Sequence, residues 1–503
     1  MSAMPAVAPS ESAAFPGRVW IADDGRIAAV TRGASPGPAA FAEAPVVDVG
    51  DDLVLPGFID LHNHLAYNTL PLWAEPDRTS PWAHHNAWPQ AASYSASTTW
   101  PAYALITACP QELLAFVETK AIVGGTTSIQ GSPPKNRPRD GWLVRNVDDE
   151  TFGTANPNLI YASVLTAKPA ALADRANKMR AGAGFVYHCA EGRRGSLVAR
   201  EYTDAQAAGC LQPRFVAVHT NAVDPRDYRA WTAAGAIAWS PFSNLWLYGE
   251  TTDVPAARAA GLTVCLGSDW APSGSKNILG ELKAARLAAD AQGWQLSDED
   301  LVRMVTCEPG DVLARAWPAQ VGRLQPGAQA DLVVVSARRG VDPYAAVVRA
   351  TEADVDLVVV DGAPRYGTTT LMAAAGAEAT SPLRVGNRTM RLALTQPSQP
   401  PQPWSFAEVV DRMEEVRAHP RREIEAAQAM YGGWAGRLGA ADAPLRLALD
   451  MPSGVGPVGG LPKDLDQLVV PELASLVPDE EWLSSVVGRG FHGGVLDGLK
   501  EFY

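Results

Sequence analysis

Short apolar runs alternate with more polar stretches through the middle of the chain. The apolar runs lie near residues 58–61, 121–129, 159–165, 184–187, 215–218, 236–239 and 262–267. The stretches between them that can form helices are 111–123, 170–182, 198–209, 225–235, 253–260 and 278–291. Strands that alternate with helices predict βα units and a parallel sheet. The region spans about 265 residues, a usual size for a (β/α)8 TIM-like barrel, with an open doubly wound sheet as the competing interpretation.

Two β-rich stretches flank this alternating region. Residues 17–55 contain short apolar runs separated by an Asp-Asp-Gly turn, and residues 321–366 return to the same pattern. Each stretch is too short to bury a core alone, so we expect one β-domain built from both ends of the barrel. The predicted boundaries are 1–55 and 321–366 for the two parts of this β-domain and 56–320 for the barrel.

Residues 367–503 form a C-terminal extension of different character. It contains a Pro-rich linker at 396–403, an amphipathic stretch at 405–436 and a Gly- and Pro-rich end with one more helical piece near 479–487. We therefore expect a linker followed by a mainly helical segment. The extension can complete the pocket of a neighbouring copy of the chain, so a homo-oligomer is one alternative.

Composition excludes several classes of protein. Apolar residues make up 47% of the chain and charged residues 19%, which excludes disorder throughout. The net charge of −13 argues against a protein that coats nucleic acid. The apolar residues are dispersed, so we expect no membrane span. The first 15 residues lack the features of a secretory signal, and the five cysteines show no CxxC, so we expect a cytoplasmic protein.

Histidine and aspartate residues follow several of the apolar runs. His62 and His64 close the run in FIDLHNH, and side chains two positions apart on a strand point to the same face. Two imidazoles on one face form a natural metal chelate. Other runs are followed by His188, His219 and Asp269. Since the carboxyl ends of barrel strands converge at one mouth, we expect these side chains to meet there.

Three neutral imidazoles and one carboxylate suit Zn²⁺ or Fe²⁺ and leave a place for water. A bound Zn²⁺ lowers the pKa of that water from about 15.7 to about 7 and gives hydroxide at neutral pH. A single histidine after an apolar run is usually structural, but the full set at successive strand ends is hard to obtain by chance. The sequence therefore predicts a hydrolytic metal centre.

Together these motifs resemble the metal-dependent amidohydrolase superfamily. PGFIDLHNH, HCAEG, VHTN, SPFSN and LGSDWAPSGSKN stand where that superfamily has its motifs of strands 1, 5, 6, 7 and 8. The opening β segment and GRLQPGAQADLVVV resemble its composite β-sandwich, so the resemblance covers residues 17–366. Because Glu191 follows His188 as HxxE, the chain most resembles the branch of triazine hydrolases, guanine and adenosine-type deaminases and imidazolonepropionase.

The resemblance implies one divalent metal ion, with Zn favoured over Fe. Its ligands would be His62, His64, His188 and Asp269, and Asp269 would also accept a proton from water. A second metal would need a bridging ligand after strand 4, where the sequence offers only Lys168, three residues beyond the apolar run.

The resemblance also implies catalytic roles for Glu191 and His219. Glu191 would pass a proton to the leaving or ring nitrogen, and His219 would orient the water or polarise the electrophile, on the metal or beside it. Two carboxylates in different settings can divide the acid and base work in this way. The alternative for Glu191 is a surface carboxylate at the start of a helix, where the helix dipole favours it.

The loop after the first barrel strand is rich in aromatic residues. Trp88 is one of several that can form the walls of a pocket for a flat substrate or pack against one another on the barrel rim. The adjacent His84 and His85 point in different directions, so we leave them out of the metal site. Asn244 in SPFSN is a candidate substrate contact.

Basic residues gather in two other loops of the predicted mouth. Arg193 and Arg194 follow strand 5, and Lys135, Arg137 and Arg139 follow strand 2. On an acidic protein, such cations suggest a small-molecule substrate with a carboxylate or phosphate, although solvated loops give the same pattern. If Arg193→Ala left KM unchanged, an anionic substrate would lose its main support.

The sequence thus predicts a hydrolase that acts on a non-peptide C–N bond through a metal-bound hydroxide. Deamination of an aminated ring and opening of a cyclic amide are the expected reactions. The alternatives are another leaving group at the same site, either a linear amide or a halide, and a catalytically inactive metal-binding scaffold.

Overall fold

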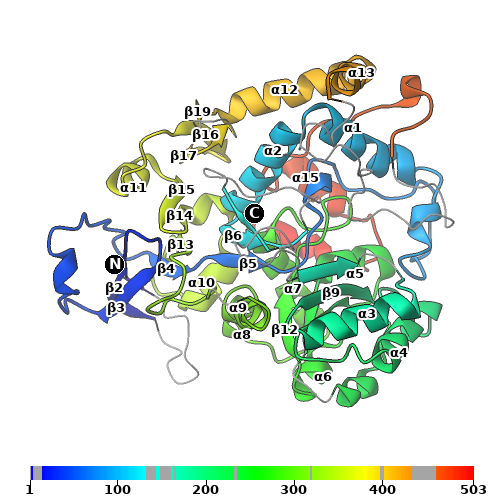
Figure 1. Ribbon diagram of the computed structural model, residues 1–503, viewed down its shortest axis with the longest axis horizontal. Helices are drawn as coiled ribbons and strands as arrows, with labels where there is room; N and C mark the ends of the chain where they lie inside the picture. Colours follow the sequence, from blue (N-terminus) through cyan, green and yellow to red (C-terminus); the bar gives the residue numbers. More distant parts are fainter. Residues whose placement is uncertain are drawn as a thin grey trace.

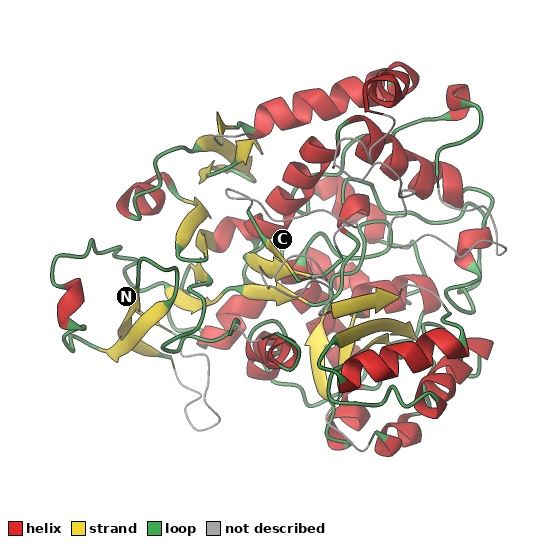
Figure 2. Cartoon of the chain, in the orientation of Figure 1, coloured by secondary structure: helices red, strands yellow, loops and turns green. Residues whose placement is uncertain are grey.

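The computed structural model describes residues 2–3, 14–131, 143–147, 160–163, 166–231, 235–317, 320–396, 402–431 and 460–503. Helices surround parallel strands in one half of the molecule, and a larger sheet extends from it on the other side (Figure 1 and Figure 2). None of the helices in these ranges combines the length and the apolar character that a membrane crossing needs.

Two parallel sheets form the centre of the fold. The first has the order β12-β11-β10-β9-β8 and consists of β8 (Ile160–Ser163), β9 (Gly184–Cys189), β10 (Phe215–His219), β11 (Ala236–Trp239) and β12 (Thr263–Leu266). The second has the order β5-β6-β7 and consists of β5 (Phe58–Asp60), β6 (Thr126–Ile129) and β7 (Arg145–Asn146). The strands with described side chains are almost wholly buried, which explains their uninterrupted apolar runs.

The two parallel sheets meet where β5 and β12 end. The amide of Leu61 donates to the carbonyl of Leu266 over 3.4 Å, and Asn63 and Asp269 form an isolated parallel bridge. The ends of these two strands therefore lie side by side, although they are about two hundred residues apart in the chain.

Helices connect and cover the parallel strands. The helices of this region are α1 (Trp100–Ala108), α2 (Pro110–Val123), α3 (Pro169–Arg180), α4 (Arg200–Ala207), α5 (Pro241–Tyr248), α6 (Val254–Ala259), α7 (Ile278–Ala291), α8 (Asp298–Arg303) and α9 (Cys307–Ala314). The expected helix at 225–235 is a 3₁₀ helix, Pro225–Ala230. The apolar run at 121–129 divides between the end of α2 and β6, because Gly125 at φ +81° turns the chain between them.

Strands from both flanks of the parallel sheets share one nine-stranded sheet. Its order is β16-β17-β15-β14-β13-β4-β1-β2-β3. The strands are β1 (Ser2–Ala3), β2 (Phe15–Ile21), β3 (Ile27–Arg32), β4 (Leu53–Pro56), β13 (Leu332–Val335), β14 (Val355–Val360), β15 (Ala363–Gly367), β16 (Ser381–Val385) and β17 (Arg388–Leu392). The two flanks join where β13 pairs antiparallel with β4.

A buried ion pair connects this sheet to the parallel strands. Arg145 in β7 pairs with Asp331, which precedes β13, and with Asp361, which follows β14. Arg145 is only 7% exposed and Asp331 only 1%. Removal of one partner would leave an unpaired buried charge, so this contact holds the two parts in register.

The C-terminal part contains helices and short strands that pack on the rest of the molecule. Its elements are α10 (Pro343–Arg349), α11 (Thr369–Ala374), β18 (Thr395–Gln396), β19 (Gln402–Pro403), α12 (Phe406–Ala418), α13 (Pro420–Tyr431) and α15 (Glu480–Val486). The amphipathic stretch forms two helices rather than one. Pro420 lacks an amide hydrogen and disfavours helical geometry at His419, whose φ and ψ are −137° and 52°.

Residues 460–503 pack against the helices that follow the last parallel strands. The amide of Phe491 donates to the carbonyl of Trp246 in α5 over 3.0 Å. The ring of Trp482 stacks on that of Phe242, with ring centres 5.8 Å apart. The ammonium group of Lys276 donates to Ser475. The C-terminal segment therefore supports α5, the helix that carries Asn244.

Candidate metal centre

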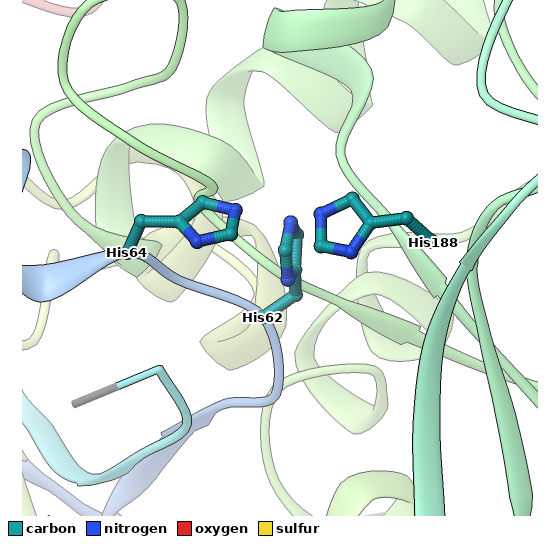
Figure 3. A group of neighbouring side chains, drawn as sticks. All are labelled: His62, His64 and His188. Carbon is teal, nitrogen blue, oxygen red and sulfur yellow. The ribbon is translucent and has the colours of Figure 1, made fainter. Parts of the chain in front are cut away.

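Three imidazoles from two strands meet in the interior. His62 and His64 follow β5, and His188 lies near the end of β9. The ring of His62 lies between the other two (Figure 3), with ring centres 4.8 Å from His64 and 4.6 Å from His188. Each ring offers a nitrogen within 4.8 Å of the others, and all three residues are buried. The two histidines follow the strand rather than lie within it, and their spacing of two residues still brings both imidazoles to one point, as the sequence predicts.

Asp269 and His219 complete this cluster. The Oδ1 atom of Asp269 lies 3.3 Å from Nε2 of His62 and 3.4 Å from Nε2 of His64. Its Oδ2 atom lies 4.0 Å from Nε2 of His219. Asp269 and His219 have φ values of 59° and 66°, a left-handed conformation uncommon for residues other than glycine. Such backbone strain is typical of functional sites, where the surrounding structure holds it.

The donor set suits a divalent metal ion. Burial lowers the pKa of His62 to about 4 and holds the pKa values of His64 and His188 well below the usual value. The imidazoles are therefore neutral and have lone pairs for a cation. Both ring nitrogens of His64 are buried without a hydrogen-bond partner among the described residues. Such atoms are costly unless something binds them, and a metal ion is the partner that imidazole nitrogens fit.

A hydrogen-bond network holds the ends of β5 and β12 together beneath the cluster. Asp60 accepts from the amide of Ser268 over 3.0 Å and from the side chain of Asn63 over 3.2 Å. The hydroxyl of Ser268 also donates to Asp60. Burial raises the pKa of Asp60 to about 7, although these donors oppose the rise. The network fixes the chain segments on which His62 and Asp269 stand.

His219 is oriented by Asn244 from α5. Nδ1 of His219 and Oδ1 of Asn244 are 2.9 Å apart, and Nδ2 of Asn244 donates to Thr252 over 3.3 Å. Because the amide oxygen only accepts, Nδ1 carries the proton and Nε2 keeps a lone pair on the side of Asp269. Asn244, a candidate substrate contact, thus contacts His219, and a contact with substrate stays a prediction.

Glu191 is buried within the site rather than exposed at a helix start. Its exposed fraction is 3%. Oε1 accepts from the hydroxyl of Tyr248 over 2.6 Å, and Oε2 lies 3.8 Å from Nε2 of His219. Burial alone would raise the pKa of Glu191, but His219, His85 and His188 together lower it below its usual range. Two carboxylates, Glu191 and Asp269, therefore flank the same imidazole from different settings.

The aromatic loop packs its rings against one another. Trp88 is 2% exposed, and its ring centre lies 5.5 Å from those of Tyr94 and Trp270. Its indole nitrogen donates to the hydroxyl of Tyr248 over 2.8 Å. Trp88 therefore supports the residue that holds Glu191, and a contact between Trp88 and substrate stays a prediction.

Arg193, one of the basic residues expected at the mouth, pairs outside the cluster, and a contact between Arg193 and substrate stays a prediction. The guanidinium of Arg193 pairs with Glu250, with Nε to Oε1 at 2.9 Å. Lys135, Arg137 and Arg139 lie outside the described residues. Lys168, the candidate bridging ligand, is exposed in front of α3. Every group of described residues that could hold a metal ion shares at least one histidine with this cluster, which favours a single metal ion.

Three residues of the site are not among those expected. Tyr248 and His85 contact Glu191, and Glu201 contacts His85. Tyr248 lies four positions after Asn244, so helical spacing could have placed both on one face of α5. For His85 and Glu201 the contact depends on the path of a loop, and residue spacing gives no comparable signal.

Several known proteins with similar sequences are named as deaminases. Residues 203–364 match the model of the Amidohydrolase family. The 5-methylthioadenosine/S-adenosylhomocysteine deaminase of Symbiobacterium thermophilum is 26% identical over 68% of this chain and 87% of its own length. The 5'-deoxyadenosine deaminase of Methanothermobacter thermautotrophicus is likewise 26% identical, over 68% of this chain and 87% of its own length.

Solved structures give the same fold. An adenosine deaminase from Xanthomonas campestris with bound zinc matches with a TM-score of 0.55 at 16% identity, over 84% of this chain and 97% of that one. An atrazine chlorohydrolase from Arthrobacter aurescens TC1 complexed with zinc matches with a TM-score of 0.52 at 18% identity, over 72% and 93%. These likenesses and the parallel sheets indicate a TIM-barrel-type α/β fold. The family match and the similar deaminases confirm the resemblance to the amidohydrolases, and the chain is a hydrolase that acts on carbon–nitrogen bonds other than peptide bonds.

Proposed function

We propose that this chain hydrolyses an aminated heterocycle of a small molecule and releases ammonia, and that the ring is of the adenine type. The observation that carries the proposal is the pair of buried carboxylates around His219. Glu191 and Asp269 lie 3.8 Å and 4.0 Å from its Nε2 atom, in different surroundings. The names of the similar deaminases favour an adenine-type ring over other aminated rings.

The proposal assigns one divalent metal ion, with Zn favoured over Fe, to His62, His64, His188 and Asp269. The chemistry that such an ion supplies when bound is a water molecule that loses a proton near neutral pH. It also takes the two parallel sheets as parts of one (β/α)8 barrel within residues 56–320. The nine-stranded sheet would then be the composite β-sandwich, formed from 1–55 and 321–366 and extended by β16 and β17, which lie in the segment expected to be a C-terminal extension.

The residues of this chain would move the protons of the reaction. Asp269 accepts a proton as the water oxygen bonds to the ring carbon that bears the amino group, and returns it to the departing nitrogen. Glu191 transfers the other proton of the water to the ring nitrogen. The bond from the ring carbon to the amino nitrogen breaks, and ammonia leaves. His219, fixed by Asn244, orients the water between the two carboxylates.

Ammonia release tests this proposal directly. The purified, metal-loaded protein is incubated with adenosine-type nucleosides, guanine, cyclic and linear amides and a chlorinated triazine. We expect the adenine-type compounds to release one molecule of ammonia for each molecule of hydroxylated product. Chloride release or amide cleavage without deamination would instead support another leaving group. Metal binding with no turnover of any compound would support the inactive scaffold.

A further inference from the structure

Besides His219, a further buried histidine lies next to the carboxylate of Glu191. His85 is 0% exposed and comes from the loop after β5. Its Nδ1 atom lies 3.3 Å from Oε2 of Glu191, and its Nε2 atom lies 2.9 Å from Oε1 of Glu201 in α4. One imidazole thus joins two carboxylates from opposite sides of its ring.

Glu201 is buried beside His85, and both oxygens of its carboxylate accept hydrogen bonds. Its exposed fraction is 1%. The amide of Ala190 donates to its Oε2 atom over 2.9 Å, and the hydroxyl of Thr166 donates to its Oε1 atom over 2.6 Å. With His85, these donors satisfy the carboxylate on both oxygens. A buried carboxylate needs a charged partner, and the ring of His85 is the one in contact with it.

Backbone contacts hold the loop of His85 against the segment of Glu191. The amide of His85 donates to the carbonyl of Glu191 over 3.0 Å. The amide of Arg193 donates to the carbonyl of Ala83 over 2.9 Å. His84 and Gly192 form an antiparallel bridge between them. A Cβ atom on Gly192 would lie 2.7 Å from the carbonyl oxygen of Ala83, so glycine permits this close approach. The position of the His85 ring therefore does not depend on its side-chain contacts alone.

Each carboxylate oxygen of Glu191 lies against a neighbouring side chain. Tyr248 donates to Oε1, and the His85 ring faces Oε2. Burial alone would lower the pKa of His85, but the charges and hydrogen bonds of Glu201 and Glu191 outweigh it and raise the pKa to about 10. With a proton on each ring nitrogen, His85 donates a hydrogen bond to Glu201 and forms an ion pair with Glu191, in which Nδ1 lies 3.3 Å from Oε2.

We propose that His85 and Glu201 are positioning residues which fix the carboxylate of Glu191 toward His219. The inference rests on the proposed function, in which Glu191 transfers a proton. A loosely held carboxylate would lose the alignment that proton transfer needs, whereas substrate binding and metal binding would change little. His85 therefore acts through Glu191 and need not touch the substrate.

Kinetics of matched variants test the positioning role of His85 and Glu201 in the metal-loaded enzyme. We expect His85→Asn to lower kcat by about 10–100-fold, the range for residues that orient catalytic groups, with KM and metal content nearly unchanged. Glu201→Gln keeps the size of the side chain and is expected to lower kcat in the same way. His84→Asn is the control, since the side chain of His84 contacts neither carboxylate, and its kcat is expected to match the unchanged protein. Equal kcat for the variants at positions 84 and 85 would overturn the proposal, as would a fall in metal content that accounts for the loss.

Nitrogen-15 NMR of the histidine rings separates this inference from the proposed function. In the metal-loaded protein at pH 8, we expect protons on both ring nitrogens of His85, because the carboxylates of Glu191 and Glu201 face it and the neighbouring His84, whose pKa is lowered by burial, is neutral. Glu201→Gln is expected to remove one of them. A singly protonated His85 ring in the unchanged protein would refute the positioning role of His85 and Glu201, even if the enzyme deaminates its substrate. An enzyme that releases no ammonia but shows the doubly protonated ring would refute only the function.

Discussion

Replacement of Asp269 by asparagine is expected to lower kcat for ammonia release by about 10²–10⁴-fold, the contribution typical of a positioned acid or base. Asparagine keeps the shape of the side chain but cannot accept the proton of the attacking water. It also offers a metal ion a neutral oxygen in place of a charged one, so we expect weaker metal binding. The measurement is kcat and metal content per chain for both proteins, with excess metal in the assay.

The loss should not come from unfolding. Burial raises the pKa of Asp269, so the charged carboxylate is itself unfavourable in the metal-free protein. The metal-free variant is therefore expected to melt at the same temperature as the metal-free unchanged protein, or higher. Asp227→Asn makes the same chemical change at an exposed position and serves as the control. If Asp269→Asn retained full activity, the assignment of Asp269 as proton acceptor would be wrong.

Replacement of Glu191 by glutamine is expected to lower kcat by at least about 10²-fold without loss of metal. Glutamine can still accept the hydrogen bond from Tyr248, but it cannot transfer a proton. The readouts are kcat and metal content, measured together. Glu250→Gln changes a carboxylate that pairs with Arg193 outside the cluster, and its kcat is expected to stay unchanged.

The alternative outcome for Glu191 is informative. Glu191, His188 and His219 also form a group that could hold a metal ion. A parallel loss of metal and activity in Glu191→Gln would make Glu191 a ligand rather than a proton carrier. The ligand set proposed above would then be wrong.

The sequence predicts the location of the site because the site depends on strand ends. Apolar runs at 184–187, 215–218, 236–239 and 262–267 correspond to β9, β10, β11 and β12 within about two residues. Buried parallel strands require such runs, and their carboxyl ends must meet at one edge. His62, His188 and Asp269 could therefore be brought together from the sequence alone, although they lie far apart in the chain.

The contacts of loop residues could not be predicted in this way. His85 lies in a loop whose path is set by its backbone pairing with Glu191 and Arg193, a contact between segments about a hundred residues apart. The choice for Trp88 between pocket wall and packed ring likewise depended on tertiary contacts. Asn244 was placed at the pocket edge by its motif, but only the structure shows its amide against His219.

The central claim is that one divalent metal ion per chain supports hydrolysis of the amino group. The measurement is ammonia release while Zn²⁺ is titrated into chelator-treated protein, with metal content determined by elemental analysis at each point. The account predicts no release without metal, a linear rise and a plateau at one equivalent per chain. A plateau at two equivalents, or ammonia release by the metal-free protein, would contradict it.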